Sequence, residues 1–167
     1  MSALAELKSW FDGYGLTLAV AESLTCGRVQ ARIGEISGAS GFFLGGITAY
    51  SLEQKVNLLG IDRVEAERTH CVSAAVAEQM ALGATRMFGA DLGIATTGYA
   101  EPSPAHGVVE PFAWWALVHR APHGNAIIAG RNGRIECPGA MRVDVQGRVA
   151  DAVLAELGRY LKSVRSD

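Results

Sequence analysis

Residues 16–33 read LTLAVAESLTCGRVQARI, and this stretch decides the fold. Residues 16–21 form a short, largely apolar run that predicts a buried strand. Residues 25–33 have the composition of a helix, with Thr25 available as its N-cap. A strand therefore ends at Glu22 and Ser23, and a helix begins at once.

Outward from this turn, hydrophobic periodicity predicts further helices and strands. Helices are expected at residues 2–13, 52–59, 74–88 and 142–164, with Ser51 and Ser73 as caps of the second and third. Strands are expected at 46–50, 91–97 and 114–119, after a glycine-rich loop at 37–46. Asn132-Gly133 predicts a hairpin between strands at 126–129 and 134–137. Because helices and strands alternate without a long linker or repeat, we expect an α/β fold with helices packed on a mainly parallel or mixed sheet.

Length and composition indicate one domain with a substantial core. The chain has 167 residues, of which 49% are hydrophobic and 19% charged, so residues 1–167 are expected to form a single domain. No run approaches the roughly 20 apolar residues that a membrane helix needs, and the first residues lack the order of a secretory signal. We therefore expect a cytoplasmic protein without a membrane partner.

The ionisable residues argue against a metal and against nucleic acid. Cys26, Cys71 and Cys137 are too far apart for a metal-binding pair, and Pro122 and Gly124 oppose a helix that would align His119 with His123. The net charge of −2 provides no general attraction for nucleic acid. Four arginines near the C-terminal end form either a phosphate-binding group or a solvated face: Arg131, Arg134, Arg142 and Arg148.

Ser23 is the candidate nucleophile. Its position places the hydroxyl at the end of a strand, beside the unpaired amides of a helix N-terminus, which stabilise an oxyanion or a phosphate. A serine needs a base, and Lys55 serves as one if burial removes its proton near neutral pH. The alternative is that Ser23 only forms the turn or caps the helix.

The order of motifs resembles the CinA C-terminal-domain family, which includes the nicotinamide-nucleotide amidohydrolases. The family pattern A-E-S-x-T-G-G corresponds to residues 21–27, and its G-G-x-x-x-Y-S-N-x-x-K corresponds to residues 45–55. A third block, V-S-x-x-V-A-x-x-M-A-x-G-A, corresponds to residues 72–84, and T-G-I-A-G-P is matched loosely from Thr97. The similarity covers roughly residues 10–120.

This resemblance implies a fold, a reaction and a set of site residues. The fold would be a three-layer α/β sandwich, often dimeric, and the reaction would convert nicotinamide mononucleotide to nicotinate mononucleotide and ammonia without a cofactor or metal. Ser23 would be the nucleophile, Lys55 its base, and Tyr50 a supporting hydroxyl near both. The substrate would be bound by residues from three motifs: Thr25, Cys26, Gly27, Thr97, Gly98 and, matched loosely to a G-D-R stretch, Arg142.

The chain departs from the family pattern around this centre. Cys26 replaces the first glycine of the Gly-Gly pair, as either a rival nucleophile or a small buried filler. Residues 101–107, EPSPAHG, replace a glycine-rich loop, and Glu101 would repel a phosphate unless Arg142 intervenes. Trp114 and Trp115 either alternate between core and surface or form a new pocket wall.

Three functions are consistent with these observations. The first is an amidohydrolase acting on nicotinamide mononucleotide through Ser23 and Lys55. The second is a paralogue without catalytic activity that binds a nucleotide-like ligand or a protein partner. The third is a Ser-Lys amidase with a different, phosphate-free substrate. The retained serine, lysine and tyrosine favour the first.

Overall fold

The computed structural model describes residues 3–121, 124 and 126–164. Its centre is a five-stranded mixed sheet in the order β2-β1-β3-β4-β5. The strands are β1 (Leu18–Glu22), β2 (Phe43–Thr48), β3 (Leu92–Tyr99), β4 (Phe112–Arg120) and β5 (Ile127–Glu136). β1 is parallel to both β2 and β3, whereas β4 runs antiparallel to β3 and to β5. The expectation of a mixed sheet is confirmed.

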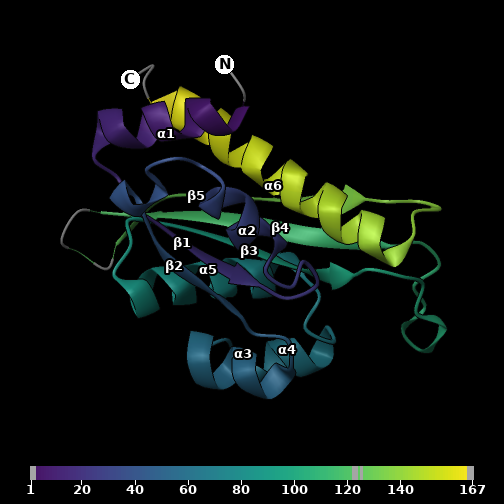
Figure 1. The fold of residues 1–167 in the computed structure, drawn as a ribbon. Helices are drawn as coiled ribbons and strands as arrows, with labels where there is room; N and C mark the ends of the chain where they lie inside the picture. The colour runs from purple at the N-terminus through teal and green to yellow at the C-terminus, as the bar shows by residue number, and fades with distance from the viewer. Residues whose placement is uncertain (1–2, 122–123, 125, 165–167) are drawn as a thin grey trace.

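Helices cover both faces of the sheet, giving the expected three layers (Figure 1). On one face lie α1 (Ala3–Tyr14), α2 (Arg28–Gly34) and α6 (Arg142–Val164). On the other lie α3 (Leu52–Leu59), α4 (Arg63–Arg68) and α5 (Ala74–Phe88). The short α4 was not predicted. Its six residues are too few to produce a helical hydrophobic period.

The alternation of β1 explains why the sheet is buried on both sides. Leu18 and Val20 contribute to the core beneath α1, α2 and α6, whereas Ala19 and Ala21 face α5. All five residues of β1 are buried. The small alanines on the α5 side allow that helix to pack closely, while larger side chains fill the opposite layer. β1 therefore delivers its carboxyl end, and Ser23 after it, to a fixed position.

Two sequence expectations were wrong. The strand expected at 46–50 is β2, and it begins at Phe43, within the segment expected to be a loop. The hairpin expected at Asn132-Gly133 is absent because β5 continues through it, with Asn132 opposite Ala116 and Gly133 opposite Trp115. A Cβ at Gly133 would lie 2.6 Å from the Trp115 indole nitrogen. Gly133 thus provides room for a tryptophan within a continuous strand.

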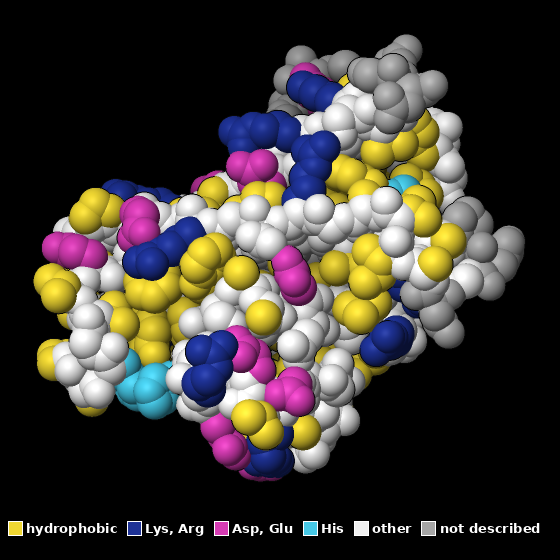
Figure 2. Space-filling view, turned by 180° about the vertical axis from the view of Figure 1, so that it is seen from behind, with side chains coloured by type: hydrophobic (Ala, Val, Ile, Leu, Met, Phe, Trp, Pro, Cys, Tyr) yellow, Lys and Arg dark blue, Asp and Glu magenta, His cyan; other side chains and the backbone are white. Residues whose placement is uncertain are grey.

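The surface seen in Figure 2 carries acidic and basic side chains interspersed rather than in a basic patch. None of the described helices is long and apolar enough to cross a membrane. The expectation about His123 lies outside the described residues. His119 itself is buried on β4, where its Nδ1 lies 2.6 Å from the Tyr160 hydroxyl of α6.

Candidate active site

Ser23 follows directly on β1 and is held by the neighbouring strand. Its backbone N–H donates to the Thr96 carbonyl of β3 at 3.0 Å, and only 7% of the residue is exposed. The chain turns after Ser23, where the N–H of Cys26 donates to the Ser23 carbonyl at 3.1 Å. These bonds fix the backbone of Ser23 at the carboxyl end of β1, from which the side chain projects.

Lys55 reaches Ser23 from the opposite layer. Ser51 caps α3 by accepting from the Gln54 N–H, and Lys55 lies one turn further on the buried face of that helix. Its Nζ lies 3.0 Å from the Ser23 Oγ and donates to the Tyr50 carbonyl at 2.8 Å. The Lys55 residue is 1% exposed. The structure therefore brings Ser23 and Lys55 into hydrogen-bond contact.

Burial lowers the pKa of the Lys55 amine, and the nearby Cys71 thiol opposes this lowering only in part. Burial also raises the pKa of Cys71, so that the thiol stays protonated over a wider pH range. Within the described residues, Lys55 forms no ion pair with a carboxylate. A buried amine without a counter-ion favours its neutral form, which is the form that accepts a proton.

Glu22 corrects the expectation that the helix N-terminus is open to substrate. Its fully buried carboxylate accepts from the backbone N–H groups of Gly27, Val29 and Gln30 at 2.9–3.1 Å, and also from the Gln30 side chain. These amides are therefore already occupied. The N-cap of α2 is Gly27 rather than Thr25, whose hydroxyl instead lies 2.7 Å from that of Thr96.

Two backbone donors remain beside the nucleophile. Among the described residues, the N–H groups of Leu24 and Thr25 have no backbone or side-chain acceptor, although both residues are buried. They belong to the two residues directly after Ser23. Amides in this position relative to a nucleophilic serine are suited to an oxyanion that forms on its acyl adduct.

A cleft in two adjacent parts lies beside Ser23. The inner part, about 270 Å³, is lined by both Ser23 and Lys55, and the outer part, about 180 Å³, by Glu101 and Arg142. Four residues line both parts, which makes them neighbours: Leu24, Tyr50, Gly98 and Tyr99. The cleft thus joins a nucleophile at one end to a charged pair at the other.

The outer part is bordered by a contact between two segments distant in sequence. Arg142, the first residue of α6, donates to the Glu101 carboxylate at 2.7 Å and to the Tyr50 hydroxyl at 2.9 Å. Tyr50 is 55% exposed, and its contact with Lys55 is made by its backbone carbonyl. The hydroxyl expected near Ser23 and Lys55 is thus bonded to Arg142 instead.

The other predicted binding residues differ in their access to the cleft. Thr97 lines the inner part, and its hydroxyl donates to the Cys71 carbonyl at 2.7 Å. Gly98 lines both parts, and a Cβ there would lie 2.4 Å from the Phe112 carbonyl oxygen. Cys26 is exposed with a φ of 49°, so it is not a buried filler. Neither Cys26 nor Gly27 lines the described cleft.

An aromatic wall on the inner part was missed by sequence reasoning. Tyr99 and His70 line it, and the His70 ring lies 4.3 Å, centroid to centroid, from that of His106 in the segment that replaces the family's glycine loop. Residues 103–108 close on themselves through two hydrogen bonds between Ser103 and Val108. The sequence signal was weak because Tyr99 at the end of β3 and His70 in the turn after α4 share no helical or strand period.

The remaining candidates lie elsewhere. Trp114 and Trp115 pack into the cores on opposite faces of the sheet and do not line the cleft. On β5, Arg131 and Arg134 lie over the rings of Tyr160 and Phe112. Of the four C-terminal arginines, Arg142 alone lines the described cleft. Among the described residues, no group of three His, Cys, Asp or Glu side chains is placed to hold a metal.

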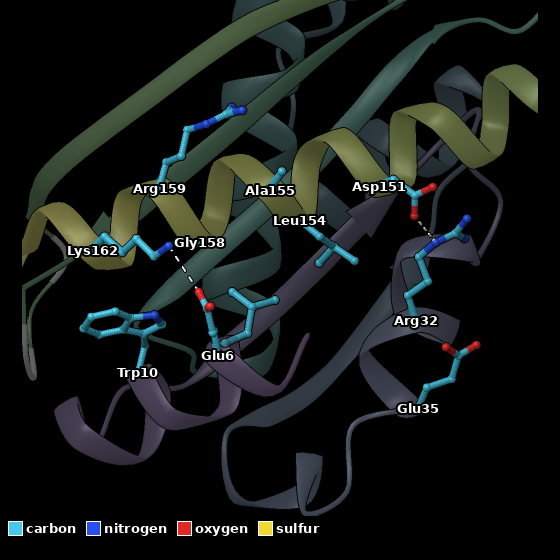
Figure 3. A pocket seen from close by; sticks show the side chains of 11 residues that line it. Glu6, Trp10, Arg32, Glu35, Asp151, Leu154, Ala155, Gly158, Arg159 and Lys162 are labelled. Atoms are coloured by element: carbon cyan, nitrogen blue, oxygen red, sulfur yellow. Dashed lines mark hydrogen bonds and ion pairs between the residues drawn. The ribbon is translucent and has the colours of Figure 1, made fainter. Parts of the chain in front are cut away.

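A larger hollow of about 580 Å³ lies between α1, α2 and α6 and shares no lining residue with the cleft (Figure 3). Its walls carry two ion pairs, Lys162 with Glu6 and Arg32 with Asp151, around the apolar Leu154 and Trp10. Because these charges already neutralise one another, the hollow has no excess charge to select a ligand. Its lining residues do not include a nucleophile and base like Ser23 and Lys55.

Comparison with known proteins gives one consistent family. A model of the CinA C-terminal domain matches residues 2–161. A CinA-like protein of Chlorobium limicola is 37% identical over 149 residues, which are 89% of this chain and 34% of that protein. A CinA-like protein of Picosynechococcus is 51% identical over 86 residues, 52% of this chain and 20% of that protein. The chain therefore spans about a third or less of the length of these relatives.

Solved structures agree with the fold over nearly the whole chain. A CinA-superfamily competence-damaged protein of Klebsiella pneumoniae has a TM-score of 0.86 at 25% identity, covering 96% of both chains. A competence or damage-inducible protein of Enterobacter asburiae has a TM-score of 0.86 at 26% identity, covering 95% of this chain and 96% of that one.

Proposed function

The chain belongs to the CinA C-terminal domain family, and from this premise we propose that it is a Ser-Lys amidohydrolase that converts nicotinamide mononucleotide to nicotinate mononucleotide and ammonia. The observation that carries the proposal is the 3.0 Å separation of Lys55 Nζ and Ser23 Oγ in a buried setting. The choice of substrate is supported by the resemblance of the motifs around these two residues.

In the first step Ser23 attacks the carboxamide carbon and Lys55 accepts the serine proton. The Tyr50 carbonyl accepts an N–H of Lys55, so that the amine's lone pair is free to face the Ser23 hydroxyl. The carbonyl oxygen of the substrate becomes an oxyanion, for which the Leu24 and Thr25 amides are the available donors. The product of this addition is a tetrahedral adduct covalently bound to Ser23.

In the second step the adduct loses ammonia. The Lys55 ammonium returns its proton to the leaving nitrogen, the C–N bond breaks, and an acyl ester remains on Ser23. Water then adds to this ester with Lys55 again as base, which releases the carboxylate product and restores the serine. No metal or organic group takes part in either step.

The inner part of the cleft suits a planar amide. Tyr99 and His70 provide aromatic faces beside Ser23, against which a pyridine ring stacks at the usual separations of aromatic pairs. The ribose and phosphate would then extend past Tyr50 toward Arg142 in the outer part. A guanidinium at that end is the group best matched to a phosphate.

Ammonia release from nicotinamide mononucleotide by the purified chain tests the proposal. Ser23→Ala is the inactive comparison, because it removes the nucleophile and leaves the fold unchanged. Ammonia formation above the Ser23→Ala background supports the proposal. Tight binding of the nucleotide with no turnover would instead favour a binding protein.

A further inference from the structure

The cation available to a phosphate in the outer part of the cleft is already paired. Arg142 is the only lysine or arginine that lines that part in the described structure, and its guanidinium lies 2.7 Å from the Glu101 carboxylate. Its second nitrogen donates to the Tyr50 hydroxyl. The outer cleft therefore presents a neutral pair where a binding site for a phosphate would present a net positive charge.

We propose that Glu101 is a specificity-determining residue that weakens the binding of phosphorylated substrates by occupying Arg142. The inference rests on the proposed amidohydrolase function and specifies the substrate class of the same site. A substrate phosphate must displace the carboxylate from Arg142 and then remain near it. A substrate that ends in a ribose does not meet this competition, because its hydroxyls donate hydrogen bonds to a carboxylate.

The backbone holds both partners in place. Glu101 follows the buried Ala100 just beyond the end of β3, and Arg142 begins α6 beyond Gly139, whose N–H donates to Glu110. The contact therefore links the segment after β3 to the start of α6 across the cleft. It also lies next to the Tyr50 hydroxyl, and Tyr50 lines both the outer and the inner part.

The ion pair between Glu101 and Arg142 is weak enough for a ligand to displace it. The Glu101 and Arg142 side chains are 60% and 43% exposed, and an exposed ion pair contributes little because water and salt screen it. A phosphate can therefore displace Glu101, at the cost of affinity. Glu101 reduces the preference for the nucleotide without closing the cleft.

Glu101→Gln tests the inference, because it keeps the size of the side chain and removes its charge. We expect its KM for nicotinamide mononucleotide to fall about fivefold, with the KM for unphosphorylated nicotinamide riboside changing by less than about twofold. The gain should shrink at high salt, which screens half-exposed charges. Glu35→Gln, an equal change of charge outside the cleft, should alter neither KM.

A double variant identifies the route of the effect. When Arg142→Gln is already present, adding Glu101→Gln should no longer lower the KM for the nucleotide, because the freed guanidinium is what binds the phosphate. A gain that persists without Arg142 would overturn the inference. Equal changes for nucleotide and riboside, or no change for either, would overturn it as well.

Binding to Ser23→Ala separates this inference from the proposed reaction. If no protein releases ammonia, the proposed function fails, but the dissociation constant of the nucleotide can still be compared in Ser23→Ala with and without Glu101→Gln. Fivefold tighter binding of the nucleotide by Ser23→Ala with Glu101→Gln than by Ser23→Ala alone supports the role of Glu101. Unchanged binding, or the absence of binding in both, overturns it.

Discussion

The Lys55 amine lies 3.0 Å from the Ser23 hydroxyl, although the two residues belong to different layers of the fold and are separated by 32 positions in sequence. β1 fixes Ser23 and α3 fixes Lys55, so their contact depends on the packing of that helix against the sheet. The contact combines a nucleophile with a base that burial favours in its neutral form.

Replacement of either partner should remove amidase activity. Ser23→Ala and Lys55→Met should each lower kcat by about a thousandfold or more, because nucleophile and base act as a unit. The double variant should be little worse than either single variant. Lys162→Met, which removes an exposed lysine paired with Glu6, is the matched control and should retain activity. Retained turnover in Ser23→Ala would exclude this mechanism.

The rate should rise with pH. Burial lowers the pKa of Lys55 from its ordinary value of 10.5, and the amine acts as a base only when neutral. kcat/KM should therefore increase as the pH rises toward the folded pKa and level off below the pH at which a free lysine titrates. Initial rates of ammonia release across the pH range measure this. A profile that falls with increasing pH would contradict a lysine base.

Lys55 should also reduce the stability of the fold. Because its folded pKa is lowered, the unfolded chain binds more protons than the folded chain between that pKa and about 10.5, so stability should rise with pH through this window. Lys55→Met should unfold at a higher urea concentration than the original chain, and its free energy of unfolding should be greater by about 1 kcal/mol or more. The difference should be greatest below the folded pKa and should change as the pH rises toward 10.5. Equal stability at low pH would contradict it.

The sequence predicted the fold where side-chain periodicity was strong. The four long helical patterns and the β1 strand are present because apolar spacing reports directly on the face that is buried. β5 was misjudged because Asn132-Gly133 is a local turn signal, and the Trp115 ring that uses the glycine's space lies on another strand. Contacts of this kind have no local sequence signal.

The candidate site was predictable in its residue types but not in all of its connections. The motif order marked Ser23, Lys55 and Arg142, and the charge of Glu101 already pointed to Arg142. The role of the Glu22 carboxylate as acceptor for the first amides of α2 was not predicted, because it depends on how the chain turns after β1. The family resemblance implied that the Tyr50 hydroxyl lies near Ser23 and Lys55. The backbone carbonyl makes that contact, since it lies at the turn before α3.

Cys26 should carry backbone strain that glycine would relieve. Its φ of 49° lies in the left-handed region, which costs a residue with a Cβ about 1 kcal/mol. Cys26→Gly should therefore raise the free energy of unfolding by up to about 1 kcal/mol, less the entropy that glycine adds to the unfolded chain. Cys26→Ala, which keeps the Cβ, should give no gain. Equal effects of the two would assign the change to loss of the thiol.

Glu22 should be essential to the turn that carries Ser23. Its buried carboxylate accepts from three backbone N–H groups of the α2 N-terminus, so removing it leaves these donors, including that of the buried Val29, without their acceptor. Glu22→Ala should lower the free energy of unfolding by about 3 kcal/mol, as measured in urea.

Glu22→Gln is the sharper form of this prediction, because it keeps the shape of the side chain but turns one acceptor into a donor that faces backbone N–H groups. It should cost about 2 kcal/mol. Ser23 directly follows Glu22, so kcat should fall while KM for the substrate changes little. Glu35→Gln, at the other end of α2, should change neither stability nor kcat by a comparable amount. Similar losses in Glu22→Gln and Glu35→Gln would show that Glu22 acts only through its charge.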